Sequence, residues 1–545
     1  MSFIRSGMSL ELSTKRSNST VLGITLAQLG AIMVALSATL FAFMGIQLVT
    51  ADFATIADTV PDDAYYYVLP AFHFAKTGFI SFDGINATNG FHPLWFWICS
   101  LLARMSTDKE MLMRLVIATS YAFTGLVPFV LGNLKCFKDA GLRKAIFISI
   151  LLSLGSTRFI ASQALEVGVY AFFLSLLLVQ LESLFDADGA VSRRNLILFA
   201  VTLGISILAR LDCVLLFGLA FIALSIYRKR LFLDLKSLIL VAAIVTAIVS
   251  TWLIFCYFTV HFISQDSSNV KRMWIEYERD RFGLLRLRNF KHGLSLVILS
   301  PVQMALASLS FLIPMVILIG LKMKELKSLV TGDMMKRMTL PLLLLTCAGI
   351  QGVISRYFSA DQFLWYMTPG CIIWAMLAAY LVSQIKVNFS QARIMVGVIA
   401  VALVAQFGQM IAKHQGYWGQ STYITMIHSA EEMIPEGAVI GSWNSGVFAF
   451  HSSHRVVNLD GLINHQVLEF YRTKTYERCF EALGVDYVFD WEETGETPQS
   501  FIGKPRAIYF ASKPLPLEKI KEYPAGKVRF VLYKVIKEAK VATKF

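Results

Sequence analysis

Long apolar runs alternate with short polar segments along most of this 545-residue chain. A helix needs about 20 consecutive apolar residues to cross a bilayer, and runs of that order recur between residues 21 and 412. The pattern therefore predicts about eleven membrane-spanning helices. Their expected positions are 21–49, 112–134, 145–162, 168–185, 195–210, 212–227, 237–260, 295–320, 339–357, 365–385 and 393–412.

The apolar segment 92–105 is short for a full crossing, and the charge of the loops decides how it is treated. Basic loops collect on the cytoplasmic side of membrane proteins. If 92–105 does not cross, all the basic loops fall on that side. These loops are 135–144, 192–195, 227–230, 322–327 and 384–393. We therefore expect 92–105 to be an interfacial helix, with the N-terminus in the cytoplasm and the C-terminus outside.

Beyond residue 412 the hydropathy falls and the pattern changes. Short alternating runs bounded by turn residues predict strands, here at 438–443, 455–460, 485–490, 506–510 and 528–535. Helical patterns lie near 421–433 and 465–483. The predicted division is a cytoplasmic tail (1–20), a transmembrane domain (21–412) whose first outer loop is 52–111, and a small α/β domain outside the membrane (413–545).

Composition agrees with an α-helical polytopic membrane protein. Mean hydropathy is +0.60 and only 16% of residues are charged, against about 25% in soluble proteins. The net charge of +13 comes from basic residues in short loops, so it reflects the orientation of the helices in the membrane, and no nucleic-acid partner is expected.

The seven cysteines have no CxxC or regular spacing, so neither a disulfide framework nor a zinc site is predicted. His451 and His454 have metal-compatible spacing, but no acidic third ligand is forced.

The first candidate for chemistry is a pair of acidic residues just beyond the first span, Asp62 and Asp63. A structural interpretation is that Pro61 and the pair begin a helix, which explains one aspartate better than two. In a functional interpretation, a carboxylate near the bilayer loses hydration, so its pKa rises and it becomes a better general base. Either aspartate fits that role.

A turn-rich stretch follows, with turn signals at 83–84 and 89–90 and a helix start expected at Pro93. Asn89 and His92 lie beside that start. They have the chemistry to bind sugar hydroxyls or an anionic group, helped by the helix dipole. The alternative is a loop that only needs tight turns.

The predicted topology places further charged residues on the same outer face: Glu166, Arg210, Asp212, Lys271 and Arg356. The simpler interpretations are that Glu166 stabilises a helix N-terminus and that Asp212 pairs with Arg210. A functional alternative is that the cations stabilise a departing lipid phosphate, on which negative charge develops.

These features together resemble membrane glycosyltransferases of the GT-C fold. The resemblance rests on the Asp pair before an aromatic run, DGINATNGFHPLW, SQALE, ARLD, and the C-terminal WNSGVFAF and VVNLDGLIN. It runs from about residue 55 to about residue 490. Relatives include protein O-mannosyltransferases, lipid A aminoarabinose transferases and mycobacterial arabinofuranosyltransferases. Many have glycine where this chain has Ala164, two residues before Glu166.

The resemblance implies inverting transfer of a sugar from a polyprenyl phosphate to an acceptor hydroxyl on the outer face. Asp62 or Asp63 would be the base, and Arg356, Lys271 or Arg210 would bind the donor phosphate. The residues expected to contact the sugar or acceptor are Glu166, Asn89, His92, Asp212 and Tyr366. No metal and no cofactor is required, because a monophosphate can leave with cationic side chains alone.

The expected partners are a polyprenyl-phosphate-linked sugar, a glycan, lipid or protein acceptor, and membrane lipids, at a bacterial inner membrane. Three alternatives stay open. A flippase or polymerase of lipid-linked glycans shares the lipid partner but needs no base in the first loop. A secondary transporter would show inverted repeats, and none is evident. A non-catalytic scaffold would use the Asp pair only as a helix cap.

Overall fold

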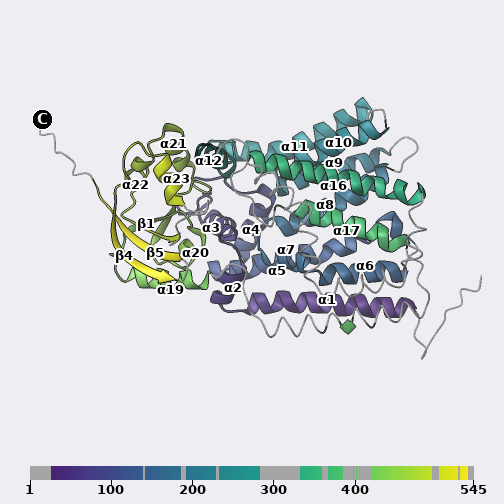
Figure 1. Ribbon diagram of the computed structural model, residues 1–545, viewed down its shortest axis with the longest axis horizontal. Coiled ribbons are helices and arrows are strands. Elements are labelled where there is room, and N and C mark those ends of the chain that lie inside the picture. The colour runs from purple at the N-terminus through teal and green to yellow at the C-terminus, as the bar shows by residue number, and fades with distance from the viewer. Residues whose placement is uncertain are drawn as a thin grey trace, which may run out of the picture.

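The computed structural model describes residues 26–138, 141–185, 192–228, 232–282, 332–358, 366, 368–384, 420–493, 503–525 and 528–537, with four isolated positions between 397 and 404. Within these ranges, long helices run side by side along the long axis of the molecule (Figure 1). A unit built around a β-sheet lies at one end of them. The predicted span 295–320 and most of 393–412 lie outside the described residues.

The predicted spans within the described residues are all helical. They are α1 (Leu26–Thr50), α5 (Lys109–Leu131), α6 (Gly141–Ser153), α7 (Gly155–Ser162), α8 (Val167–Phe185), α9 (Arg193–Ala209), α10 (Cys213–Arg228), α11 (Leu235–Thr259), α16 (Gly332–Phe358) and α17 (Thr368–Gln384). Among the described helices, α1, α5, α8 and α11 are long and apolar enough to cross a bilayer. The α6–α7 pair, bent by 53°, adds a fifth if it is one span. The protein is therefore a multi-pass membrane protein, and the number of spans stays a prediction.

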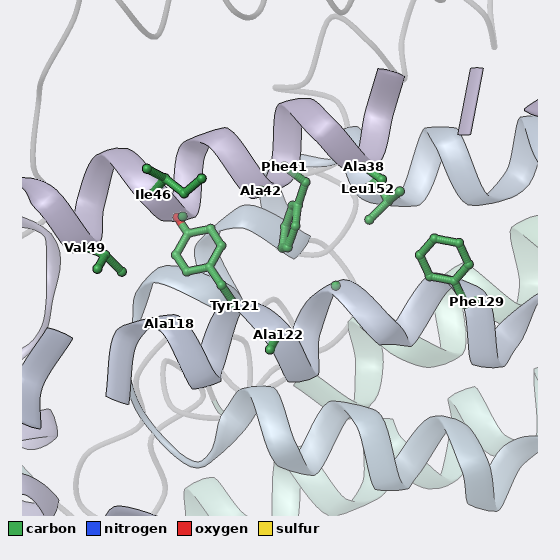
Figure 2. Close-up of a pocket in the computed structure, with 12 residues that line it drawn as sticks. Ala38, Phe41, Ala42, Ile46, Val49, Ala118, Tyr121, Ala122, Phe129 and Leu152 are labelled. Atoms are coloured by element: carbon green, nitrogen blue, oxygen red, sulfur yellow. The ribbon is translucent and has the colours of Figure 1, made fainter. Parts of the chain in front are cut away.

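The contact between α1 and α5 is apolar and leaves a cavity of about 390 Å³ (Figure 2). The rings of Phe41 on α1 and Tyr121 on α5 lie 5.3 Å apart between centroids and form part of its wall. Its lining shares no residue with the polar cluster described below.

The first outer loop forms three short helices, α2 (Phe53–Thr59), α3 (Asp62–Thr77) and α4 (Pro93–Met105), between the sheet and the long helices (Figure 1). As predicted, α3 begins at Asp62 after Pro61, and α4 begins at Pro93. The 13 residues of α4 extend about 20 Å, less than the roughly 30 Å of a hydrocarbon core. This length agrees with an interfacial helix.

The sheet has strands β1 (Val439–Ser442), β2 (Arg455–Asn458), β3 (Tyr487–Glu493), β4 (Leu517–Ala525) and β5 (Val528–Val535), in the order β2-β1-β3-β5-β4. Strand β1 is parallel to β2 and β3, and β5 is antiparallel to β3 and β4. Four of the predicted strand segments are correct.

The predicted strand at 506–510 is wrong, because this segment belongs mainly to helix α23 (Gly503–Tyr509). A run of five residues is compatible with the repeat of a helix as well as with that of a strand. Ala507 and Phe510, which are three positions apart, are both buried, as the repeat of a helix requires. Arg506 is also buried, with its guanidinium 4.0 Å from the ring centroid of Trp274. The strand β4 was missed because most of its side chains are partly or fully exposed, so it carries little apolar alternation.

Helices cover both faces of the sheet, because alternate strand residues point to opposite sides. Phe530 and Leu532 of β5 pack in one core, and Val531 and Tyr533 pack in the other. The first face is covered by α19 (Ser421–Glu431) and α20 (Gly446–His451). The second face is covered by α21 (His465–Thr473), α22 (Cys479–Ala482), α23, and α12 (Asp266–Phe282), which comes from the loop after α11. We refer to the described residues from 420 to 537 as the C-terminal unit.

Candidate functional site

A buried polar cluster lies beneath the first outer loop, centred on Glu166. This side chain follows α7, only 4% of the residue is exposed, and it accepts a hydrogen bond from the Tyr67 hydroxyl at 2.8 Å. Its other oxygen accepts a hydrogen bond from Nη1 of Arg210 at 3.1 Å and lies 3.8 Å from Nε2 of His92. With Asp212, these residues are called the Glu166 cluster below. The structure thus brings together four of the predicted site residues.

The turn that carries Glu166 has an unusual backbone. Ala164 has a φ of +54°, in the left-handed region that glycine adopts most easily. The turn therefore keeps a conformation suited to the glycine of many relatives, although the residue here is alanine. The carbonyl of Ala164 accepts a hydrogen bond from Nε1 of Trp95 at 3.1 Å. Because Trp95 lies in the first turn of α4, Glu166 is on the same side as the first outer loop.

Arg210 connects two acids. Its Nε and Nη2 contact the two carboxylate oxygens of Asp212 at 3.1 and 3.2 Å, while Nη1 contacts Glu166. The predicted pairing of Asp212 with Arg210 is therefore confirmed. Arg210 is only 2% exposed, so this bidentate geometry is shielded from water. Two carboxylates already compensate its charge.

A second cation approaches the cluster through an aromatic residue. Nζ of Lys271, on α12, donates a hydrogen bond to the Tyr366 hydroxyl at 2.8 Å. The Arg210 guanidinium lies 4.6 Å from the centroid of the same tyrosine ring. Lys271, Arg210 and Tyr366 therefore lie together, as a phosphate site requires. The backbone of Arg356 lies in α16, and its side chain falls outside the described part of the structure.

The two aspartates of the first loop have different surroundings. The carboxylate of Asp62 accepts hydrogen bonds from the backbone N–H groups of Gly446 at 3.0 Å and Val447 at 2.7 Å, at the start of α20. Burial raises the pKa of Asp62, and these hydrogen bonds oppose that shift. A Cβ at position 446 would overlap the Asp62 carbonyl oxygen, so only glycine permits this approach. Asp62 thus anchors α3 to the C-terminal unit.

Asp63 lies on a different face of α3. Residues three and four positions apart share one face of a helix, so Asp63 stands beside Tyr66 and Tyr67, and Asp62 also lies one turn before Tyr66. A hydrogen bond from Tyr66 opposes the rise that burial causes in the pKa of Asp62. The Tyr67 hydroxyl contacts Glu166, whereas the Tyr66 hydroxyl lies 3.4 Å from the carboxylate of Asp460. The face that carries Asp63 therefore lies between the Glu166 cluster and Asp460.

Asn89 lies away from the Glu166 cluster. Its backbone N–H donates to the Asp266 carboxylate at 3.2 Å, and its side-chain oxygen accepts from the Asp266 N–H at 3.1 Å. Asp266 also contacts Nδ1 of His465 at 2.7 Å. A Cβ at Gly90 would overlap the carbonyl oxygen of Leu462. Asn89 and its neighbour thus join the first loop to α12 and the C-terminal unit, while its predicted sugar contact stays a prediction.

His92 is the one predicted residue of the turn-rich stretch that reaches Glu166. Its backbone N–H donates to the Tyr67 hydroxyl at 3.3 Å, and it precedes the first residue of α4. Burial lowers the pKa of His92, so the ring is neutral at pH 7. A neutral imidazole offers one donor and one acceptor to a ligand hydroxyl.

Sequence reasoning did not single out Tyr66, Tyr67 or Asp460. The two tyrosines could have been found from helical periodicity, because they follow Asp63 by three and four residues. Asp460 stands in the quoted motif VVNLDGLIN, but nothing in the sequence indicates that this motif contacts α3.

Within the described residues, no group of three or more His, Cys, Asp or Glu side chains is arranged to hold a metal ion. His454 contacts Glu431 instead, with 3.4 Å between Nδ1 and Oε1. The expectation that no metal is needed stays a prediction.

Comparison with known proteins gives a family model that matches the C-terminal part of the chain and solved structures that match most of its length. A family model described as a domain of unknown function, DUF8728, matches residues 409–533. No curated protein matches the chain. The crystal structure of ArnT from Cupriavidus metallidurans in the apo state is similar with a TM-score of 0.53 and 13% identity, over 93% of this chain and 97% of that one. The structure of the same ArnT bound to undecaprenyl phosphate gives a TM-score of 0.51 and 14% identity, over 93% and 98%. At these identities the likeness concerns the fold alone, and the chain shares the overall fold of these ArnT structures.

Proposed function

We propose that the protein is a membrane glycosyltransferase that moves a sugar from a polyprenyl phosphate to an acceptor hydroxyl at the outer face of the membrane. The observation that carries the proposal is the position of Asp63, on the helix face that also presents Tyr67 to Glu166 and Arg210. A base, a sugar-binding acid and cations thus gather under one loop. The ArnT of similar fold was crystallised with undecaprenyl phosphate, which supports a polyprenyl-phosphate donor here.

In this proposal Asp63, rather than Asp62, is the base. Burial raises the pKa of Asp62, but both of its carboxylate oxygens already accept backbone hydrogen bonds at the start of α20, so they are occupied by the protein itself. Asp63 takes the proton of the acceptor hydroxyl while the oxygen attacks the anomeric carbon. The bond from that carbon to the phosphate oxygen breaks, and its electron pair leaves with the polyprenyl phosphate. Attack from the face opposite the phosphate inverts the anomeric centre.

The remaining residues divide between phosphate and sugar. Lys271 and Arg356 are the proposed phosphate ligands, and the Tyr366 hydroxyl holds the Lys271 ammonium in place. Arg210 is less suited to neutralise a phosphate, because Glu166 and Asp212 already compensate its charge. Its role is to orient these two acids toward sugar hydroxyls.

The test is a transfer assay with the full-length protein in vesicles and radiolabelled polyprenyl-phosphate sugars. A transferase consumes donor in step with product, whereas a flippase or scaffold does not. We expect Asp63→Asn to lower the rate by about 100-fold or more, because base catalysis contributes that much, while its melting temperature changes little. Asp62→Asn is the matched variant, and it should lower the melting temperature more than Asp63→Asn does. Near-normal activity in both single variants and in the double variant would rule out the mechanism.

A further inference from the structure

The motif WNSG (residues 443–446) forms the turn before α20, whose first amides bind the carboxylate of Asp62. Asp490, at 7% exposure, accepts hydrogen bonds from the backbone N–H groups of Trp443 at 2.6 Å and Asn444 at 3.0 Å. The Asn444 side chain donates to its other oxygen at 2.9 Å. These contacts fix the turn before α20, whose first amides then meet Asp62.

The motif NLDG fixes a second carboxyl group, that of Asp460. The Leu462 N–H donates to Oδ1 of Asp460 at 2.7 Å, and the Gly461 N–H donates to Oδ1 of Asn458 at 3.0 Å. Nδ2 of Asn458 in turn donates to Ser445 Oγ at 2.9 Å, which ties the two motifs together. With Oδ1 held by this turn, Oδ2 of Asp460 faces the hydroxyl of Tyr66.

We propose that Asp460 is a positioning residue for Asp63, so that the reaction centre contains a carboxyl group supplied by the C-terminal unit. This inference rests on the proposed function. Asp460 is buried at 7% exposure, and its contact residue Tyr66 follows Asp63 by one helical turn. The charges of Asp63 and Asp62 both act on Asp460 and favour its protonated form.

Burial also sets the protonation state of Asp460. Burial, with smaller contributions from the charges of Asp63 and Asp62, raises the pKa of Asp460 to about 8. Asp460 therefore keeps its proton at pH 7, and its Oδ2 lies 3.4 Å from the Tyr66 hydroxyl, which donates toward it. The ionisable groups that face Asp460 are Asp62, Asp63 and Tyr66 on α3, Tyr471 on α21, and Tyr476 in the 3-10 helix Tyr476–Arg478.

Loss of that proton changes the site. Above about pH 8 an ionised Asp460 adds a negative charge beside Asp63, where an anionic lipid phosphate must approach. The value of kcat/KM should therefore fall as Asp460 ionises. Asparagine resembles the protonated acid at every pH, because it keeps a donor and carries no charge.

The experiment compares kcat and KM from pH 6 to 9.5 for the full-length protein, Asp460→Asn and Asp460→Ala. We expect kcat at pH 7 to fall about threefold in the asparagine variant and about 30-fold in the alanine variant, which lacks the hydrogen bond. The wild-type kcat/KM should fall about tenfold per pH unit above pH 8, and this decline should be absent in Asp460→Asn. Asp486→Asn is the control, because Asp486 precedes β3 beside the start of β1, at the end of these strands opposite to the turn before α20, and pairs with Lys537. Wild-type rates in the alanine variant, or an unchanged alkaline decline in the asparagine variant, would overturn the inference.

A second measurement does not depend on activity. Melting temperatures are compared for Asp63→Asn, Asp460→Asn and the double variant, at pH 7 and pH 9. Because the two carboxyls interact, the shifts of the single variants should not add up to that of the double variant, and the deviation should grow at pH 9. Additive shifts at both pH values would show that the groups are not coupled. Failure of the proposed function looks different, because the wild-type protein would then consume no donor while the deviation remains.

Discussion

At the scale of single residues, the separation of Asp62 from Asp63 decides the mechanism. Adjacent helical residues point about 100° apart, so the two side chains leave α3 in different directions, although the charges of both reach Tyr66 and Asp460. One meets the amides of α20 and the other lies on the face of Tyr66 and Tyr67. The sequence identified the pair but could not divide it, because the partners of Asp62 lie 384 and 385 positions further along the chain.

The raised pKa of Asp460 makes stability depend on pH. The folded protein holds this proton up to about pH 8, whereas the unfolded chain releases it near 3.8. The stabilisation is therefore complete below about pH 4 and is lost as the pH rises through 8, by about 1.4 kcal/mol per pH unit. We expect the melting temperature of Asp460→Asn to fall less between pH 5 and 9 than that of the wild type. Parallel melting curves across this range would contradict the assignment.

Arg210 offers a test of the buried ion network. Removal of one partner from a buried pair leaves an uncompensated charge, so Arg210→Ala should cost about 3–5 kcal/mol of unfolding free energy. Lysine keeps the charge but lacks the fork that meets both oxygens of Asp212, so Arg210→Lys should recover only part of the loss. Arg279→Ala is the control, because its exposed pair with Asp280 contributes less than about 1 kcal/mol. Equal losses in the two alanine variants, measured by denaturant unfolding in detergent, would argue against the network.

At the scale of elements, the sequence predicted long helices well and short elements poorly. Spans such as α8 carry many turns of apolar sequence, and the starts of α3 and α4 are marked by Pro61 and Pro93. By contrast, α23 and β4 have few residues or a largely exposed surface, so tertiary contacts decide their conformation. The contact of α3 with α20 could not be predicted from the sequence either, because it depends on the absence of a Cβ atom at Gly446.

Gly446→Ala tests this contact between elements. A methyl group there would overlap the Asp62 backbone, so α20 must withdraw from α3 and both hydrogen bonds to the Asp62 carboxylate are lost. We expect faster amide exchange in α3 and α20 and a drop in transfer of about tenfold or more, because the base shifts with its helix. Gly218→Ala in α10 is the control, since nothing lies within 4 Å of an added Cβ there. Unchanged exchange in α3 would show that the contact does not hold this helix.

At the scale of the whole molecule, the described helices and the C-terminal unit meet through the first outer loop and α12. Trp274 of α12 packs in the core of the C-terminal unit, and Asp266 at its start contacts both Asn89 and His465. Hydropathy and loop charge predicted a membrane part and an outer part from sequence. They could not show that the C-terminal unit contacts the first loop at Asp62 and Tyr66.

The predicted orientation can be tested with reporter fusions. We expect alkaline phosphatase fused after Phe545 to be active, because the C-terminus is predicted to lie outside. The same phosphatase inserted in loop 135–144 should be inactive. A fluorescent protein should show the opposite pattern at these two positions. Phosphatase activity at 135–144 would mean that α4 crosses the membrane.

The hydrogen bonds of Asp62 also set an order of events during biosynthesis. A ribosome adds about 5–20 residues per second, so the amides of Gly446 and Val447 are made roughly 20–80 seconds after their partner. During that interval α20 has not been synthesised, so the first loop lacks this contact. A truncated chain inserts its helices but never closes this contact. The contact between the first loop and the C-terminal unit therefore forms last, so the proposed function predicts that incomplete chains do not consume the lipid-linked sugar.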